Sequence, residues 1–358
     1  MTVTGALEEC LTVASTEFEV LEARGIETRD GRRVVRVVLG VPRSDFGVSV
    51  RRLYKSLVKA GCYPYLYRSD EGLILVIARP PRGKGKGLLA LALALATLAS
   101  VYISGMALSG GGEGSWSPLA YLIGLLAPLA VHELGHLAGM LFYGVPRSPP
   151  FFIPAPPIQL GFLGTFGAVI NLRWLPPTSE SLAIIGVLGP LAGFLLALPL
   201  AAIGIESSLV VPETSLPEGT IALPVAPLIF AVMGAMKAEP GMAVILSPLG
   251  FASYIVLLIT FLNLIPIGSL DGGHVIRGLT SESGHYIATI MAAALGVIVA
   301  PFFPPATLFV LIAFTLHILM GGRHPGPSMA EGDLSPLSAL TALTYGVLVA
   351  LTLPVPVA

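Results

Sequence analysis

The chain has 358 residues, of which 54% are apolar and only 11% carry a charged side chain. Soluble domains carry about 25% charged residues, so this composition excludes a wholly soluble protein and places most of the chain in a membrane. The net charge of −1 conceals an uneven distribution, because residues 1–86 hold 15 of the 20 lysines and arginines but only 10 of the 21 acids. A basic soluble part therefore precedes a membrane part.

Residues 1–80 predict a small α+β domain. Strands are expected over residues 18–26 and 33–40 around a turn at 29–31, then over 63–67 and 72–78, with a helix over 48–60. The basic residues of this domain are interpreted as a solvated face, or one that lies against anionic lipid, and not as a nucleic-acid site. The domain shows no catalytic constellation.

The two cysteines, Cys10 and Cys62, both lie in the soluble part. Their spacing matches no metal site, and we expect them to be reduced thiols. The N-terminus shows no basic segment followed by an apolar one, so no cleavable signal peptide is expected, and the first membrane helix would act as the insertion signal.

A basic linker at 81–86 leads into an uncharged run at 87–112, which is long enough to cross a bilayer. Basic residues before this first span place the N-terminal domain in the cytoplasm. Further spans are expected over residues 118–143, 181–205, 247–264, two helices within 286–316 and 337–353. This arrangement leaves Lys237 alone among the basic residues on the outer side. Residues 219–236 are interpreted as a membrane-surface or re-entrant segment.

Residues 149–173 are mostly apolar but do not fit a regular helix. Prolines crowd residues 149–157, and the following stretch contains Gly161, Gly164 and Gly167. Non-helical backbone is tolerated at membrane depth only where protein or a wet cavity covers it. We interpret the stretch as a re-entrant extended segment; an ordinary cytoplasmic loop is the alternative. The predicted fold class is thus a multi-span α-helical membrane protein of about seven transmembrane helices, with this segment near a metal site, plus the α+β domain.

The second span contains His132-Glu133-Leu134-Gly135-His136, an H-E-x-x-H pattern. On a helix, residues i and i+4 share one face, so both imidazoles can bind one cation while Glu133 reaches the water bound to it. Catalytic zinc sites keep an open position, and the metal lowers the pKa of that water to about 7. Such a site requires a third ligand.

The third ligand is expected to be Asp271. It lies in an apolar stretch where the fourth span is broken, and an acid at membrane depth is costly, which makes it a candidate functional residue. The second and fourth spans run in the same direction, so Asp271 and His132 can share a depth. A role as the N-cap of the following helix is also compatible.

The motifs His132–His136, Gly189–Gly193 (Gly-Pro-Leu-Ala-Gly), Asn263–Pro266 and Leu270–His274 resemble those of the site-2 protease family of intramembrane zinc metalloproteases. The resemblance covers about residues 88–322 and is closest to the archaeal and plant-chloroplast type, which has a soluble domain before the membrane core. Composition and hydropathy divide the chain into a soluble domain (1–80), a basic linker (81–86), a membrane core (87–322) that the resemblance identifies as the metalloprotease part, a second linker (323–335) and a C-terminal transmembrane helix (336–358).

The resemblance implies that His132, His136 and Asp271 bind one Zn²⁺ and that Glu133 is the general base. Asn263 would contact substrate, although it could instead be a packed polar residue. Gly189–Gly193 would allow close helix approach. His274 is expected to pack or to support a ligand, and the other three histidines, His285, His317 and His324, to lie at interfaces.

A substrate helix must unwind to expose a peptide bond, and the extended segment could pair with it by strand addition, through Gly164, Gly167 and Asn171. The partners expected are therefore a transmembrane protein substrate and the lipid bilayer, and no nucleic acid. Lateral access between the first span and the fifth or sixth is implied by the resemblance alone.

The function predicted is intramembrane proteolysis of membrane-anchored proteins, with the active site toward the cytoplasmic side. The alternative is a metal-binding membrane transporter, which is disfavoured because no internal repeat is found. An inactive scaffold is a weaker alternative, because the base and all three ligands are present. The substrate and the oligomeric state are not indicated.

Overall fold

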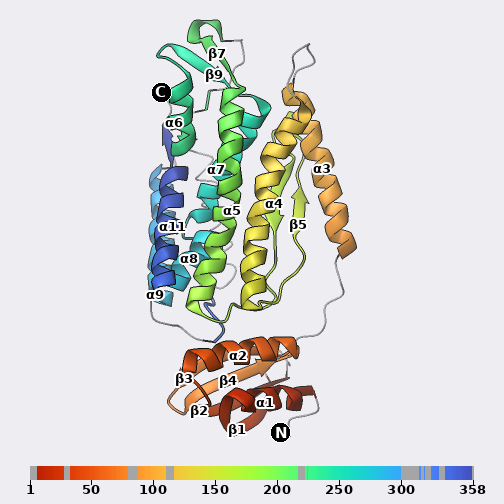
Figure 1. Cartoon of the computed structure of the whole chain (residues 1–358), viewed down its shortest axis with the longest axis vertical. Helices are drawn as coiled ribbons and strands as arrows, with labels where there is room; N and C mark the ends of the chain where they lie inside the picture. The colour runs from red at the N-terminus through yellow and green to blue at the C-terminus, as the bar shows by residue number, and fades with distance from the viewer. Residues whose placement is uncertain are drawn as a thin grey trace.

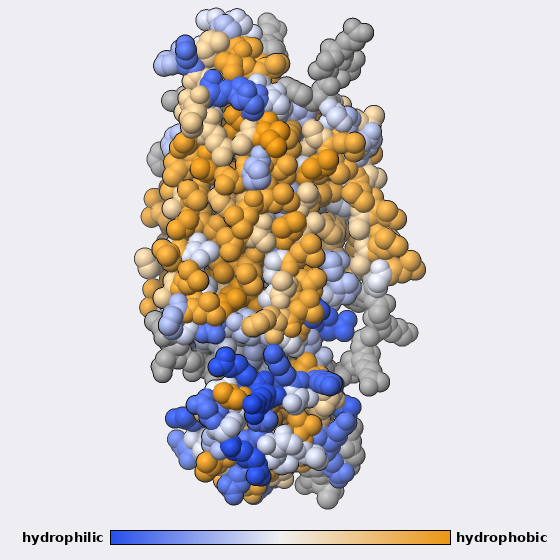
Figure 2. All heavy atoms as spheres, viewed as in Figure 1, coloured by the Kyte–Doolittle hydropathy of each residue, from blue (hydrophilic) through white to orange (hydrophobic). Residues whose placement is uncertain are grey.

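The computed structural model describes residues 6–27, 33–79, 87–109, 117–216, 222–223, 225–299, 314–315, 318, 324–329 and 335–356. Figure 1 shows a small N-terminal domain at one end of a long bundle of helices, with the C-terminus at the far end. In Figure 2, apolar side chains cover the visible face of the bundle, whereas hydrophilic ones dominate the small domain. The composition break in the sequence is therefore also a break in space.

The N-terminal domain is a four-stranded antiparallel sheet with two helices. In chain order its elements are α1 (Ala6–Glu17), β1 (Phe18–Glu27), β2 (Arg33–Pro42), α2 (Phe46–Lys59), β3 (Tyr63–Ser69) and β4 (Gly72–Ala78), and the strand order is β1-β2-β4-β3. Apolar residues at helical spacing turn one face of α2 into the core, and the side chain of Asp45 caps its first turn. The helix α1 was not predicted, and the turn expected at 29–31 lies outside the described residues.

The two cysteines form a disulfide, which corrects the expectation of reduced thiols. Cys10 on α1 and Cys62, immediately before β3, are both fully buried and joined across 52 residues of sequence. The sequence spacing could not show this, because only the folded sheet brings the two residues together. The bond fastens α1 to the rest of the domain.

Three helices of the bundle are long and apolar enough to cross a membrane: α3 (Gly87–Ser109), α4 (Pro118–Tyr143) and α5 (Ser179–Glu206). They correspond to the first three predicted spans. The remaining described helices are shorter: α6 (Leu228–Lys237), α7 (Pro248–Leu264), α8 (Asp271–Leu279), α9 (Glu282–Val299) and α11 (Pro336–Thr352). The helical bundle is thus the fold of a membrane protein, whereas the count of seven spans stays a prediction, and its sixth helix lies largely outside the described residues.

Glycines set how closely these helices pack. A Cβ added at Gly135 on α4 would lie 2.3 Å from the carbonyl oxygen of Leu188 on α5, and one at Gly204 on α5 would lie 2.5 Å from the backbone nitrogen of Gly250 on α7. Small residues at such contacts are typical of helix pairs in lipid, because they let the backbones approach closely. This close packing forms the rigid frame of the site.

The extended segment after α4 is a hairpin that lies along the helices. The strands β5 (Phe151–Pro154) and β6 (Thr165–Val169) pair antiparallel, and Figure 1 shows β5 between α3 and α4. Ser100 on α3 donates a hydrogen bond to the carbonyl of Ala155 (2.5 Å), Ser104 accepts one from the backbone N–H of Ile158 (3.0 Å), and Tyr121 donates one to the carbonyl of Leu163 (3.1 Å). Helix side chains thus satisfy irregular backbone at membrane depth.

The far end of the bundle carries two further strand pairs. The strand β7 (Leu209–Pro212) pairs with β9 (Met242–Ile245), and β8 (Val225–Pro227) pairs with β10 (Pro354–Pro356), each antiparallel. Lys237, at the end of α6, donates a hydrogen bond to the backbone carbonyl of Glu206. This one basic residue is therefore held at the end of the bundle opposite to the N-terminal domain.

Two segments of the membrane part dock onto the N-terminal domain; we call 174–177 and 328–329 the docking segments. The Trp174 indole donates a hydrogen bond to the carbonyl of Pro64 (2.7 Å) and stacks on Tyr63, with 5.3 Å between ring centroids. The backbone N–H of Leu66 donates to the carbonyl of Ser328 (2.7 Å), and Met329 is buried in the domain core. The domain core is thus completed by the membrane part.

Candidate metal centre

The centre is built on α4. Ser117 caps the start of this helix and Gly144, in the left-handed conformation, ends it. His132 and His136, four residues apart, therefore lie on one face, and both are buried. Their Nε2 atoms are 3.1 Å apart. The helical spacing that the sequence predicted is realised.

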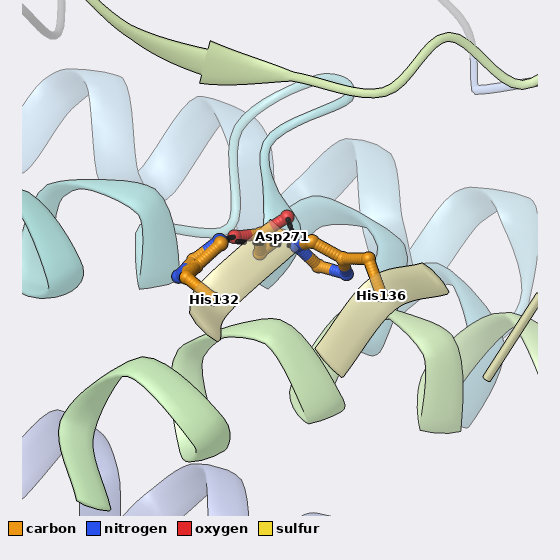
Figure 3. Close-up of side chains that lie close together, drawn as sticks. All are labelled: His132, His136 and Asp271. Atoms are coloured by element: carbon orange, nitrogen blue, oxygen red, sulfur yellow. Dashed lines mark hydrogen bonds and ion pairs between the residues drawn. The ribbon is translucent and has the colours of Figure 1, made fainter. Parts of the chain in front are cut away.

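Asp271 meets the two histidines from the start of α8. Its Oδ2 lies 3.1 Å from the His132 Nε2, and its Oδ1 lies 3.1 Å from the His136 Nε2. Figure 3 shows the three side chains converging from two elements far apart in the sequence. Leu270 is the N-cap of α8 and Asp271 is its first helical residue. The interpretation of Asp271 as an N-cap is therefore wrong by one position.

The geometry and the chemistry of this group fit a zinc ion. The candidate ligand atoms all lie within 4.8 Å of one another. Tetrahedral zinc with bonds of about 2.0–2.1 Å separates its ligand atoms by about 3.3 Å, close to the spacing observed. The Oδ2 of Asp271 is buried, and its 3.1 Å contact with the His132 Nε2 lacks hydrogen-bond geometry, as expected of two atoms that face a shared cation. Two imidazoles and a carboxylate leave one tetrahedral position for a water or a substrate.

The histidines are oriented by α5. The Nδ1 of His136 donates to the backbone carbonyl of Ile185 at 2.8 Å, which leaves its Nε2 free to bind a metal. A Cβ added at Gly189 would lie 2.2 Å from that Nε2, and one at Gly193 would lie 3.0 Å from the Cβ of His132. Glycines at 189 and 193 therefore make room for the imidazoles, in agreement with the close approach expected of this motif.

Glu133 follows His132 in the sequence and is buried near the ligands. Its carboxyl group lies near the backbone of Ile170, the residue that directly follows β6. In Figure 3 the extended segment passes over the side of the centre opposite to α5. A carboxylate, three candidate metal ligands and a strand thus meet at one place.

The other residues singled out in the sequence lie around this centre. Asn263 is half-buried in the last turn of α7. Gly164 and Gly167 both adopt positive φ, at +85° and +100°, but a Cβ would meet the backbone of Val101 at Gly164 and open space at Gly167. Asn171 is exposed. Gly164 therefore fastens the hairpin to α3, whereas Gly167 and Asn171 are accessible.

Two of the histidines expected at interfaces, His285 and His324, are buried in the protein. The His274 Nδ1 lies 2.8 Å from the His324 Nε2, and the ring of His285 packs 5.2 Å from that of His324. His317 lies outside the described residues. Two contacts were not predicted from the sequence: that of His274 with His324, and that of His136 with the backbone carbonyl of Ile185. The presence of further histidines could have indicated the first contact. The second contact involves a backbone carbonyl, which leaves no signal in a sequence.

Comparison with known proteins identifies the family of this chain. The model of peptidase family M50 matches residues 120–301, which include all three candidate ligands. A rice protein (Oryza sativa subsp. japonica) named "Probable zinc metalloprotease EGY1, chloroplastic" is 32% identical over 54% of this chain and 34% of its own length. Its Arabidopsis thaliana counterpart is 31% identical over 54% of this chain and 36% of its own.

A second Arabidopsis thaliana protein, named "Probable zinc metalloprotease EGY2, chloroplastic", is 32% identical over 57% of this chain and 35% of its own length. These alignments span only about a third of the relatives' own length. No solved structure matches the chain significantly. The match to the family model lies over the helical part that carries the centre.

Proposed function

Because the chain belongs to peptidase family M50, we propose that it is an intramembrane zinc endopeptidase that hydrolyses peptide bonds in or near the transmembrane segments of membrane-anchored proteins. One observation carries the proposal. His132, His136 and Asp271 converge with ligand spacing, beside the buried Glu133, among helices long enough to cross a membrane. A carboxylate next to a hydrolytic metal centre is the arrangement that peptide hydrolysis requires.

When bound, zinc lowers the pKa of a water molecule and polarises the scissile carbonyl. His132, His136 and Asp271 would hold the ion, and the carbonyl of Ile185 fixes the ring of His136. Glu133 takes a proton from the attacking water and passes it to the leaving amine nitrogen. Burial of this carboxylate among helices excludes bulk water from the proton transfer.

The substrate is a transmembrane protein whose helix unwinds locally and pairs with the β6 region. Support comes from accessibility: Phe166 is 64% exposed, Asn171 is exposed and the space at Gly167 is open. Strand addition would satisfy the backbone of the unwound substrate. Asn263 would contact the same substrate from α7. Proline at residues 166–169 is expected to lower cleavage, and unchanged cleavage in all four variants would refute the pairing.

We propose that the chain crosses the membrane about seven times. The N-terminal domain lies in the cytoplasm, and the active site lies toward the cytoplasmic side of the membrane. The excess of Lys and Arg in residues 1–86 supports this orientation. The Cys10–Cys62 disulfide weighs against it, since disulfides are rare in reducing compartments. Protease protection of the N-terminal domain in sealed vesicles decides between the two orientations.

The decisive experiment compares wild type with Glu133→Gln. Purified full-length protein in detergent is incubated with a single-span model substrate, and zinc is quantified in each preparation. Cleavage by wild type alone, with about one zinc per chain in both, is the expected result. Glu213→Gln, at an exposed acid on the far end of the bundle, is the matched control and should cleave normally.

Two outcomes would overturn the proposal. Equal cleavage by wild type and Glu133→Gln would remove Glu133 as the base. Stoichiometric zinc without cleavage by any variant, across a panel of single-span substrates, would favour the metal-binding transporter, which zinc uptake into proteoliposomes would then reveal.

A further inference from the structure

The helix α2 presents two different faces. Its buried residues, Val50, Leu53, Tyr54 and Leu57 among them, pack into the domain core. Its exposed face carries four basic residues within about 12 Å of helix length and no acid. We call these residues the basic face of α2: Arg51, Arg52, Lys55 and Lys59. Helical spacing places this face opposite to the buried one.

The basic face is turned toward the membrane part. Figure 1 shows α2 on the side of the domain nearest to the bundle, running across the ends of the helices. Tyr54 donates a hydrogen bond to the carbonyl of Leu175 in a docking segment (2.8 Å), and the ammonium of Lys55 lies 5.9 Å from the centre of the Phe142 ring at the end of α4. The helix is therefore held at the level where the membrane helices end.

Little in the described structure neutralises these charges. None of the ion pairs found among the described residues involves the basic face. Arg51 donates a hydrogen bond to the carbonyl of Gly47 in its own helix. Glu180 and Arg51 both lie near Tyr143, but the carboxylate of Glu180 accepts a hydrogen bond from Ser335. Asp45, the N-cap of α2, is a second acid close to Arg51, since both would contact a Cβ added at Gly47. Four positive charges thus gather without an ion pair among the described residues.

The surface next to the basic face is apolar and exposed. Phe142 is 73% exposed and Leu141 is 57% exposed, both in the last turn of α4. Exposed large apolar side chains on a membrane helix are the surface that lipid tails cover. In Figure 2 strongly hydrophilic atoms gather where the soluble domain meets this apolar surface. A basic row directly beyond a lipid-facing surface lies where phospholipid headgroups would be.

From this arrangement we infer that the basic face of α2 is a binding surface for anionic phospholipid headgroups of the leaflet on the side of the soluble domain. Clustered Lys and Arg at a membrane surface attract anionic lipid, each with a contribution that corresponds to about a fivefold gain in binding. An acidic soluble peptide is the lesser fit, because it would not account for the adjoining exposed apolar residues. The inference goes beyond the proposed peptidase function and depends only on the membrane placement of the bundle.

The test measures lipid binding to the full-length protein. Native mass spectrometry in a neutral detergent follows titration with phosphatidylglycerol or with phosphatidylcholine of the same acyl chains. Wild type should prefer phosphatidylglycerol, and the quadruple variant R51Q/R52Q/K55Q/K59Q should lose about fivefold of that preference for each charge removed. The matched control, R24Q/R33Q/R36Q/R68Q, removes four charges from the strands of the same domain and should keep the preference.

A milder variant guards against misfolding. Arg52→Gln with Lys59→Gln leaves the Phe142 contact of Lys55 in place and should lose about half of the preference on a logarithmic scale. An unchanged preference in the quadruple variant would overturn the inference, as would an equal loss in the matched control. Tighter binding of a soluble polyglutamate peptide than of phosphatidylglycerol, abolished in the quadruple variant, would overturn it in favour of an acidic polypeptide partner.

Discussion

The two parts of the molecule are held together in different ways. The core of the N-terminal domain consists of large side chains, such as Phe18, Leu53 and Tyr54, closed by a disulfide. The membrane part instead brings backbones into near contact through glycines, such as Gly135 against Leu188. In water, burial of a large apolar side chain contributes about 1.5–3 kcal/mol, whereas lipid tails are as apolar as leucine and give no such gain. Removal of volume should therefore harm the first core, and addition of volume the second.

The largest effect is expected where added volume meets the metal centre. In Gly189→Ala, the new methyl group would lie 2.2 Å from the Nε2 of His136, so either the imidazole or α5 must move. Loss of a supporting contact at a metal site costs about 10–100-fold in affinity, and displacement of a ligand should cost more. Competition with a zinc chelator measures the change. Gly234→Ala on α6, where a Cβ would meet open space, should bind zinc as wild type does, and normal affinity in Gly189→Ala would contradict the packing argument.

The disulfide should matter to the soluble domain alone. Cys10→Ala with Cys62→Ala frees a loop of 52 residues, and the chain-entropy model gives a loss of roughly 4 kcal/mol in the free energy of unfolding. Denaturant unfolding of this domain, followed by Trp174 fluorescence, measures the loss. Reduction of the wild-type protein is the chemical control and should have the same effect, with the zinc content unchanged. A fall in zinc affinity on reduction would show that the two parts are less independent than the comparison implies.

Removal of volume distinguishes a buried position of the soluble domain from an exposed position of the membrane part. Leu57→Ala empties a fully buried position in the soluble domain and should cost about 3 kcal/mol. Leu91→Ala on α3 removes the same atoms from a position that is 57% exposed and should change stability by less than about 0.5 kcal/mol in a bilayer. Thermal unfolding of the two variants in the same lipid tests the pair. Equal losses would mean that α3 is packed against protein at this position.

A smaller loss than that of Leu57→Ala is expected at the junction. Thr178 caps α5 through a reciprocal pair of hydrogen bonds with Ser181, directly after a docking segment. Thr178→Ala should cost about 1 kcal/mol, and Thr178→Ser, which keeps the hydroxyl, should cost almost nothing. Amide hydrogen exchange in the first turn of α5 resolves the difference. Exchange as fast in Thr178→Ser as in Thr178→Ala would show that the methyl group of Thr178 stabilises the helix start.

The candidate metal centre was the part most open to prediction from sequence. His132 and His136 are linked by helical periodicity, and Asp271 stands out because a carboxylate is rare in apolar sequence. Both signals are local in the sequence. The spacing of His132 and His136 alone places them on one face once the segment is helical. The pairing of Asp271 with α4 depended on a count of how many times the chain crosses the membrane, and the structure brings the three together.

What the sequence missed depends on tertiary contact. Cys10 and Cys62 carry no spacing signal across 52 residues, and α1, which holds one of them, has a weak apolar pattern. The burial of His285 and His324 depends on contacts such as that of the His285 Nε2 with the carbonyl oxygen of Gly268 (3.2 Å), which no sequence pattern shows. The docking segment 328–329 lies in the linker predicted at 323–335, because glycines, prolines and polar residues are typical of loops, and no docking role was predicted for 174–177. Their role depends on a partner that is distant in the sequence.

The contact between Ser328 and β3 protects an edge of the sheet in the N-terminal domain. The strand β3 lies at the edge of its sheet, and an unpaired edge is a template for edge-to-edge aggregation. On that edge the backbone N–H of Leu66 donates a hydrogen bond to the carbonyl of Ser328. The N–H of Ser328 in turn donates to the carbonyl of Pro176 (2.8 Å). A fragment cut at residue 80 would lose this cover and the side chain of Met329 together, leaving a bare strand beside an open apolar hollow. Such a fragment should self-associate, so the domain's solubility is a property of the whole chain.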